Sequence, residues 1–259
     1  MHRILKSVFA LGALAILAAP AAAESAKPTV VLVHGAFADA SSWNDVIARL
    51  KKDGYPVVAV ANPLRSVKSD GDYVGRIVAG IKTPVVLVGH SYGGSVISEA
   101  AAGTKNVEAL VYVAAFAPDK GESAADLSGK FPGSTLAPTL AEPVALENGG
   151  KDLYIQQGKF HEQFAADVPA KTAKLMAATQ RPITEAALTE GAPGAAWQTI
   201  PSWFIYGDAD KNIPAKALGW MAERAHSKET VVVKGASHVV MVSHPDKVAK
   251  IIEDAASAK

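Results

Sequence analysis

The feature that most constrains the fold of this chain is the stretch PVVLVGHSYGG, residues 84–94. Its apolar run Val85–Val88 is mostly β-branched, which predicts a short strand buried on both faces, as in a parallel sheet. A G-x-S-x-G match centred on Ser91 follows, and residues 95–102 then predict a helix. We therefore expect Ser91 at a sharp strand-to-helix turn, with its hydroxyl above the sheet and the helix N-terminus pointing at whatever it attacks.

Such a turn strains the backbone at the serine and brings two chain segments close together, so its neighbours must be small. Gly89, Gly93 and Gly94 meet that requirement. This setting predicts that Ser91 is a nucleophile rather than an ordinary loop serine.

The first 23 residues differ in character from the rest of the chain. Arg3 and Lys6 precede an apolar run of twelve residues, 8–19, and three alanines then end at Ala23. The run is short for a membrane span, and the pattern predicts a secretory signal peptide cleaved after Ala23. The chain has no cysteine, so it forms no disulfide and carries no lipid-modified cysteine. We expect a periplasmic or secreted protein.

Residues 24–259 are long enough for one large α/β domain with a sizeable core. Without Arg3 and Lys6, the 26 basic residues of the chain become 24, against 25 Asp and Glu. No basic run is present, so we expect neither nucleic acid nor, once the signal peptide is removed, a membrane as a partner. We expect a monomer or a homodimer.

Strand-like and helix-like segments alternate over most of residues 24–259. The expected strands are 29–33, 56–61, 85–88, 107–115, 202–206 and 230–233. The expected helices are 41–53 (capped by Ser41 or Ser42), about 70–81, 95–102, 215–225 and 245–256. This alternation predicts an α/β fold with a doubly wound, mostly parallel six-stranded sheet, which binds ligands beyond the carboxyl ends of its strands.

The alternation is interrupted at about residues 119–199, where Pro, Gly, Ala and Gln become frequent and no strand-like run occurs. The pieces 159–166, 170–178 and 184–190 resemble short helices. We interpret the segment as a helical cap inserted into the α/β domain rather than as a second independent domain.

A serine hydroxyl is a weak nucleophile until a base, usually a histidine held by a carboxylate, removes its proton. His238 follows the expected strand 230–233, and Asp210 follows the strand 202–206, so both are expected at the same sheet edge as Ser91. Asp208 and Asp119 are the competing carboxylates. The competing histidines, which we expect in structural, helix-end or cap positions, are His34, His90, His161, His226 and His244.

The oxyanion that forms during acyl transfer needs backbone donors. One is the amide of Tyr92, directly after the nucleophile, and the other is expected from the loop after the first strand, where Ala36 follows His34-Gly35. The aromatic or polar residues that we expect near a substrate pocket are Phe37, Phe116, Phe160, His161 and Trp197.

Five segments together resemble the α/β-hydrolase superfamily: VLVHGAF, VGHSYGG, YVAAFAP, PSWFIYGDADKNIP and GASHVVMVSHPDKV. Within it, the chain is similar to small bacterial esterase-like hydrolases, which are related to plant methylesterases and hydroxynitrile lyases. The resemblance implies a triad of Ser91, Asp210 and His238, oxyanion amides at Ala36 and Tyr92, and a helical cap. The chain lacks early hairpin strands, so a minimal sheet is expected.

The expected function is hydrolysis of carboxylic esters through an acyl-enzyme on Ser91, with a small-molecule ester as substrate and with neither metal nor organic cofactor. The alternatives are amidase, lactonase, cofactor-free haloperoxidase, and C–C hydrolase or lyase chemistry, or a binding protein without catalysis. In the lyases of the family a lysine follows the catalytic histidine, whereas here the residue is Val239. The acyl and alcohol groups of the natural substrate depend on the cap, and the sequence does not define them.

Overall fold

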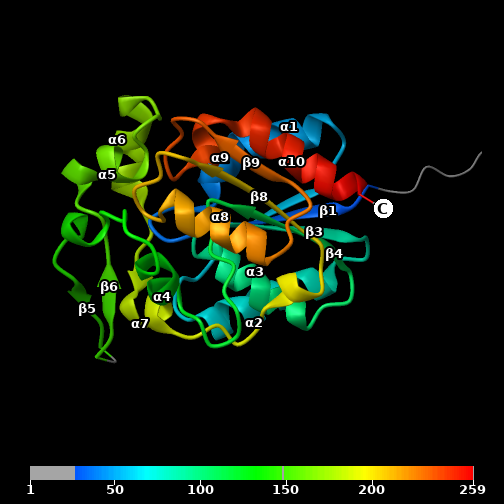
Figure 1. Cartoon of the computed structure of the whole chain (residues 1–259), viewed down its shortest axis with the longest axis horizontal. Helices are drawn as coiled ribbons and strands as arrows, with labels where there is room; N and C mark the ends of the chain where they lie inside the picture. The colour runs from blue at the N-terminus through cyan, green and yellow to red at the C-terminus, as the bar shows by residue number, and fades with distance from the viewer. Residues whose placement is uncertain (1–26, 148, 259) are drawn as a thin grey trace, which may run out of the picture.

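The computed structural model describes residues 27–147 and 149–258, and the predicted signal peptide lies outside these residues. The main sheet has six parallel strands in the order β2-β1-β3-β4-β8-β9 (Figure 1). The strands are β1 (Thr29–Val33), β2 (Val57–Val60), β3 (Val85–His90), β4 (Val107–Val113), β8 (Ser202–Gly207) and β9 (Thr230–Val233). The predicted fold class, a doubly wound parallel sheet, is confirmed.

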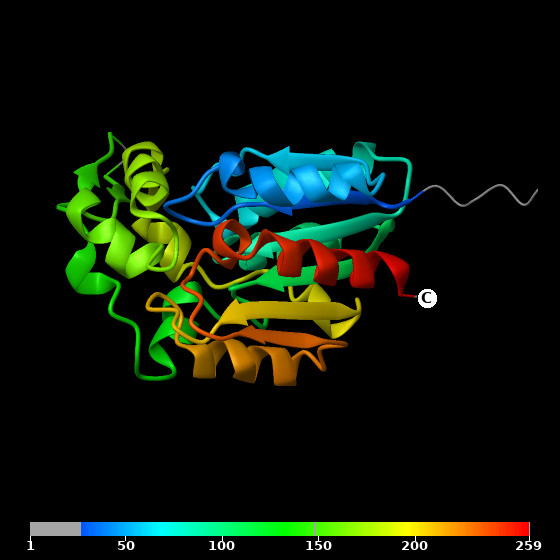
Figure 2. The ribbon, with the colours of Figure 1, turned by 90° about the horizontal axis from the view of Figure 1, so that it is seen from above.

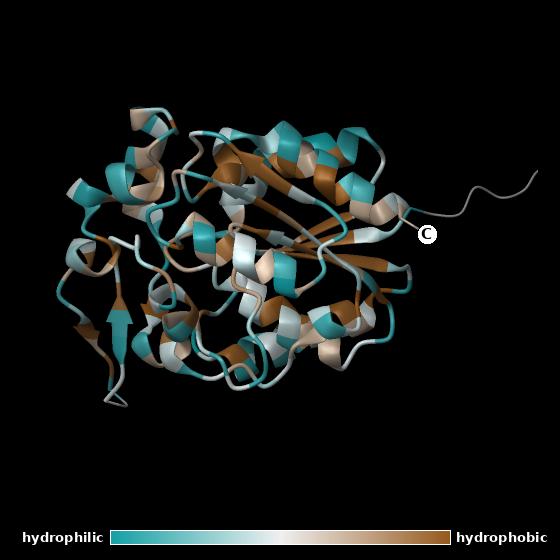
Figure 3. Cartoon of the chain, viewed as in Figure 1, coloured by the Kyte–Doolittle hydropathy of each residue, from teal (hydrophilic) through white to brown (hydrophobic). Residues whose placement is uncertain are grey.

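Burial explains why the central strands consist of apolar, mostly β-branched residues. Strands β1, β3 and β8 are buried along their whole length, whereas the edge strands β2 and β9 are each buried only at their last residue. Figure 3 shows the apolar strands enclosed between helices whose outer faces are polar. The parallel register aligns His90 with Val113, so the strands end at one common edge.

Helices cover both faces of the sheet. The helices α1 (Asn44–Lys52), α9 (Val240–Ser243) and α10 (Pro245–Ser257) pack together, and α2 (Val67–Gly80) packs on α3 (Gly93–Ala102) across the sheet from them (Figure 1). Helix α8 (Ala215–Arg224) packs against β8.

The starts of two helices differ from the sequence expectation. Asp39, rather than Ser41 or Ser42, caps the 3-10 turn Ala40–Trp43 that leads into α1, because its carboxylate accepts the Ser41 amide hydrogen bond. Ser66 caps α2, which therefore begins at Val67 rather than near Asp70.

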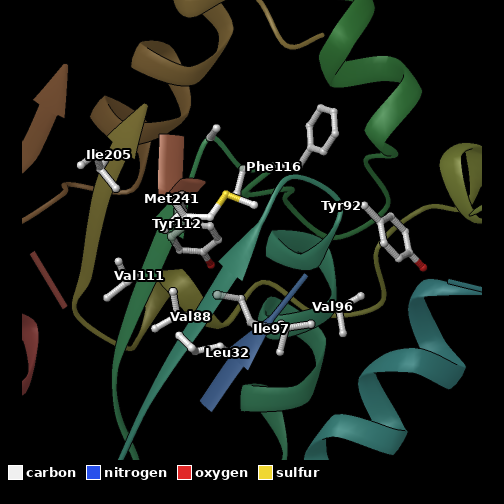
Figure 4. Close-up of a cluster of buried hydrophobic side chains, with 14 of the residues drawn as sticks. Leu32, Val88, Tyr92, Val96, Ile97, Val111, Tyr112, Phe116, Ile205 and Met241 are labelled. Carbon is white, nitrogen blue, oxygen red and sulfur yellow. The ribbon is translucent and has the colours of Figure 1, made fainter. Parts of the chain in front are cut away.

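The core lies between the sheet and these helices, as the side chains of Leu32, Val88, Ile97 and Val111 illustrate (Figure 4). Each of these side chains is fully buried. The strands that carry the functional loops therefore have little freedom to shift relative to one another.

Residues between β4 and β8 form a cap over the carboxyl edge of the sheet (Figure 2). Its helices are α4 (Ala124–Gly129), α5 (Gln157–Phe164), α6 (Ala170–Thr179) and α7 (Glu185–Thr189). It also contains a small antiparallel sheet of β5 (Val144–Ala145), β6 (Lys151–Leu153) and β7 (Ile183–Thr184), so the expectation of a strandless segment is wrong. Strands of two or three residues carry too little pattern to be detected in a sequence.

The cap contacts the domain below it through the loop after β2. Arg65 Nη1 lies 2.6 Å from Asp152 Oδ1 on β6, and the Leu64 carbonyl accepts a hydrogen bond from the Thr184 amide at 3.2 Å. Across the described residues, no helix is long and apolar enough to cross a membrane.

Candidate active site

Ser91 lies at the turn between β3 and α3, as the sequence predicts. Its φ of 53° is in the left-handed region, which a non-glycine residue adopts only under strain. A Cβ on Gly94 would stand 2.1 Å from the carbonyl oxygen of Phe116, so a glycine is required there for the chains to pass. The main chain thus fixes the Ser91 hydroxyl at the carboxyl edge of the sheet, beneath the cap.

His238 and Asp210 form a buried pair beside this turn. The two side chains follow β9 and β8, and His238 Nδ1 donates a hydrogen bond to Asp210 Oδ2 at 2.6 Å. The other carboxylate oxygen, Oδ1, accepts the amides of Asn212 at 2.8 Å and Ile213 at 3.0 Å. Asp210 is therefore held on both sides, and His238 is oriented with its Nε2 free to accept a proton.

The competing carboxylates have other partners. Asp208 is exposed and accepts the Gly235 amide at 2.5 Å, which closes the turn after β9. Asp119 accepts hydrogen bonds from Gln198 Nε2 at 2.8 Å and from the Lys120 amide at 2.7 Å. Asp210 is the one of the three that contacts His238.

Two buried histidines near the site have structural partners. His34 Nδ1 donates to the Gly35 carbonyl at 2.9 Å while its Nε2 accepts the Asn62 amide at 3.0 Å, and burial lowers the pKa of His34 to about 4. His90 Nε2 donates to the His238 carbonyl at 3.2 Å, and burial, followed by the neighbouring His238, lowers the pKa of His90 well below its usual value. Through these hydrogen bonds, both rings hold the loops around Ser91 and His238.

The two amides expected to form an oxyanion hole belong to Ala36 and Tyr92, and both residues line the cavity that contains Ser91 and His238. Within residues 27–147 and 149–258, neither amide donates a hydrogen bond, whereas the next amide in the first loop, Phe37, donates to Arg181 O at 3.0 Å. Two backbone donors beside a nucleophile are thus available to a ligand.

The side chain of Tyr92 anchors this turn in a way that sequence reasoning missed. Figure 4 shows the ring pointing away from the strand side chains, and its hydroxyl donates to Asp70 Oδ2 at 3.0 Å. Asp70 on α2 also accepts the Arg65 amide at 3.0 Å. Burial raises the pKa of the Asp70 carboxyl and of the Tyr92 hydroxyl. In the sequence, Asp70 lies 22 residues from Tyr92 and is expected only to begin a helix, so the pattern gives no sign of this contact.

The cavity above Ser91 has a volume of about 350 Å³. Its walls come from the domain at Phe37, Phe116 and Ile213 and from the cap at Leu136 and Phe164. Among the described residues that line it, none is Asp, Glu, Lys or Arg. The cavity therefore suits an uncharged, largely apolar molecule at the small end of the usual range of ligand pockets.

Of the five expected pocket residues, Phe37 and Phe116 line this cavity and the other three do not. Phe160 is fully buried and packs on Phe164, with ring centroids 4.9 Å apart. His161 Nε2 bonds to the Val168 carbonyl at 2.8 Å, and Trp197 Nε1 donates to the Pro118 carbonyl at 2.7 Å. Each of these three side chains holds part of the cap or its base together.

The described residues contain no group of three or more His, Asp or Glu side chains arranged to hold a metal ion. The site brings together a strained serine, a histidine–aspartate pair and two amides that donate no hydrogen bond among the described residues.

Residues 30–251 match the model of the alpha/beta hydrolase family. The alpha/beta hydrolase nvfD of Aspergillus novofumigatus is 28% identical over 89% of this chain and 97% of its own length. Esterase PIR7B of Oryza sativa is 28% identical over 88% and 95%, and the alpha-hydroxynitrile lyase of Arabidopsis thaliana is 24% identical over 85% and 94%.

Solved structures share the fold. Polyneuridine aldehyde esterase superposes with a TM-score of 0.75 at 21% identity, covering 88% of this chain and 98% of that one. A pyrethroid hydrolase from Sphingobium faniae JZ-2 gives 0.70 at 22% identity, covering 89% and 98%. The resemblance expected from the sequence is confirmed, and the chain belongs to the alpha/beta hydrolase family.

Proposed function

We propose that the protein hydrolyses carboxylic esters, with Ser91 as nucleophile, His238 as general base and then general acid, and Asp210 as the residue that orients His238. The observation that carries this proposal is the convergence of the strained Ser91 and the His238–Asp210 pair on one cavity that also presents two unused amides.

The reaction follows from the roles of these groups. His238 Nε2 takes the hydroxyl proton as Ser91 Oγ attacks the ester carbon, and the amides of Ala36 and Tyr92 stabilise the oxyanion. His238 then gives the proton to the departing alcohol, which leaves an acyl-Ser91. Water, activated by the same histidine, attacks the acyl group, releases the acid and restores the serine.

The substrate class that we propose is a small neutral ester of short aryl or alkyl groups. A free carboxylate or ammonium would lose its hydration in this cavity without gaining a counter-ion from its lining. Two esterases, PIR7B and polyneuridine aldehyde esterase, are among the similar proteins and agree with ester chemistry.

Hydroxynitrile cleavage is the second candidate because a lyase of that name is a relative. Departing cyanide carries a negative charge, which a positive charge near the histidine stabilises. Val239 follows His238 and is fully buried, and Lys234 is exposed to solvent. These residues favour hydrolysis, and we expect negligible release of cyanide from mandelonitrile.

The test compares wild type with Ser91→Ala on a p-nitrophenyl ester and on mandelonitrile, and adds labelling by a fluorophosphonate. We expect ester turnover and labelling by wild type, and loss of both in Ser91→Ala by several orders of magnitude, because only binding and oxyanion effects remain. Labelling of another serine, or cyanide release without ester turnover, would refute the proposal.

We also propose that the protein acts in the periplasm or outside the cell. The basic start, the apolar run and the alanines that end at Ala23 support this. Fractionation of cells that express the whole chain should find the activity outside the cytoplasm, with Glu24 as the N-terminal residue. Full-length protein in the cytoplasm would contradict it.

A further inference from the structure

The turn between α5 and α6 of the cap lies directly on the loop that carries His238. The ring of Phe164, the last residue of α5, packs against the His238 ring with centroids 5.1 Å apart and planes inclined by 63°. Three residues later, the Asp167 carboxylate accepts a hydrogen bond from the Ser237 hydroxyl through Oδ1. Ser237 immediately precedes His238 and is 2% exposed.

The same carboxylate also faces the chain that follows His238. Its second oxygen, Oδ2, lies 3.6 Å from Nδ1 of His244, the residue between α9 and α10. This oxygen is buried and has no hydrogen-bond partner among the described residues. Asp167 therefore stands between the two ends of the segment 237–244, which contains His238 and α9.

The cap turn that presents Asp167 is itself held in shape. His161 Nε2 bonds to the Val168 carbonyl at 2.8 Å, and the Val168 amide donates to the Ala165 carbonyl at 3.0 Å. The Asp167 carboxylate is consequently placed by the fold of the cap, and the Asp167 side chain is only 18% exposed.

Residues of the α/β domain hold His238 at two other points. The Asp210 carboxylate accepts a hydrogen bond from the His238 ring, and the His90 ring donates one to the His238 carbonyl. The backbone before His238 is held from the core as well, by the Gly235 amide on Asp208 and by the Ala236 carbonyl on the Ala209 amide, whereas the Ser237 side chain is held from the cap. A general base must be placed to within a fraction of an ångström, since a displacement of about 1 Å can cost about 100-fold in rate.

We propose that Asp167 is a positioning residue for His238, which makes correct placement of the base depend on the seating of the cap. The inference rests on the proposed function and assigns to a cap carboxylate the role of hydrogen-bond acceptor for Ser237. Without the Asp167 carboxylate, the Ser237 hydroxyl has no acceptor in the cap, and the segment that carries His238 loses a contact that the core does not supply.

The experiment measures kcat, KM and the pH profile of kcat for ester hydrolysis by Asp167→Ala, Asp167→Asn, Ser237→Ala and the double variant Asp167→Ala/Ser237→Ala. Active enzyme is counted by fluorophosphonate labelling. We expect Asp167→Ala and Ser237→Ala each to lower kcat by about 10- to 100-fold with little change in KM. The double variant should be no slower than the single ones, because all three lack the same hydrogen bond.

Asp167→Asn is the conservative variant, because an asparagine oxygen can still accept from Ser237, and it should retain most of the wild-type kcat. Glu162→Gln is the matched control from α5, the helix that precedes Asp167; its side chain is 82% exposed, and the variant should match wild type. Asp152→Asn removes the Arg65 ion pair elsewhere on the cap and should leave the pH profile unchanged.

Several results would overturn the proposal. These are an unchanged kcat per labelled site with only a lower melting temperature, an Asp167→Asn variant as slow as Asp167→Ala, or additive losses in the double variant. An equal loss of kcat in Asp152→Asn would also overturn it, because cap attachment in general would then explain the effect. If Asp167→Ala does not fold, Ser237→Ala tests the same bond from the core side. Failure of the wild type itself to hydrolyse esters would instead refute the proposed function.

Discussion

Replacing Asp210 by asparagine should almost abolish activity, for a reason that the hydrogen bonds of its two oxygens make specific. Oδ1 accepts two main-chain amides, Asn212 at 2.8 Å and Ile213 at 3.0 Å, whereas Oδ2 accepts Nδ1–H of His238 at 2.6 Å. The single oxygen of an asparagine will take the Oδ1 position, because there it satisfies two buried donors. Its amide nitrogen then faces His238.

An amide group that donates to Nδ1 forces the proton of the imidazole onto Nε2. His238 in this tautomer cannot accept the hydroxyl proton of Ser91, although every side chain keeps its place. The corresponding change in a serine protease triad costs about 10,000-fold in kcat, or about 5 kcal/mol of transition-state stabilisation. We expect a loss of that order for Asp210→Asn.

The assay is p-nitrophenyl ester hydrolysis under saturating substrate, with Asp208→Asn and Asp119→Asn as controls. Both controls keep a side-chain oxygen for their present donors, the Gly235 amide in one case and Gln198 in the other, and should retain wild-type kcat. A kcat for Asp210→Asn within tenfold of wild type, or an equal loss in Asp119→Asn, would show that the carboxylate is wrongly assigned.

Two further predictions concern the close packing at Gly35 and the pH dependence of stability that comes from His34. A Cβ at Gly35 would lie 2.6 Å from both the His90 carbonyl oxygen and Ser91 Cβ, so Gly35→Ala should lower kcat/KM for the p-nitrophenyl ester by about 100-fold. The control is Gly80→Ala, whose Cβ would meet no atom within 4 Å and which should leave kcat/KM unchanged in the same assay. Because burial lowers the pKa of His34 from 6.5 to about 4, the unfolded chain binds a proton in this range that the folded chain does not. The contribution of His34 to stability is therefore fully present above pH 6.5 and falls by about 3 kcal/mol towards pH 4. Urea unfolding of His34→Gln should lack this part of the slope; equal slopes would contradict it.

Much of the candidate site could be predicted because it belongs to strand ends. Buried β-branched runs identify the parallel strands, and parallel strands end at one edge, so Ser91, Asp210 and His238 fall together once the strands are known. The choice between Asp210, Asp208 and Asp119 needed coordinates or the family resemblance, because all three follow predicted strands.

The cap could be located but not resolved. Its strands β5–β7 are two or three residues long, and Val144 on β5 is 51% exposed, so neither length nor alternation marks them. Phe160 and Phe164 lie one turn apart on the same face of α5, and periodicity cannot tell that Phe164 lines the cavity while Phe160 packs behind it.

The sequence by itself determined the parallel α/β sheet and the strand-to-helix turn at Ser91, and it placed His238 and the candidate carboxylates at one sheet edge, because each of these depends on a local pattern and on strand order. Only the tertiary structure decided which cap side chains line the cavity, that Tyr92 is anchored on Asp70, and that Asp167 reaches Ser237. These pairings join residues 22 to 70 positions apart, and their contacts depend on how elements pack in space, which no local pattern encodes.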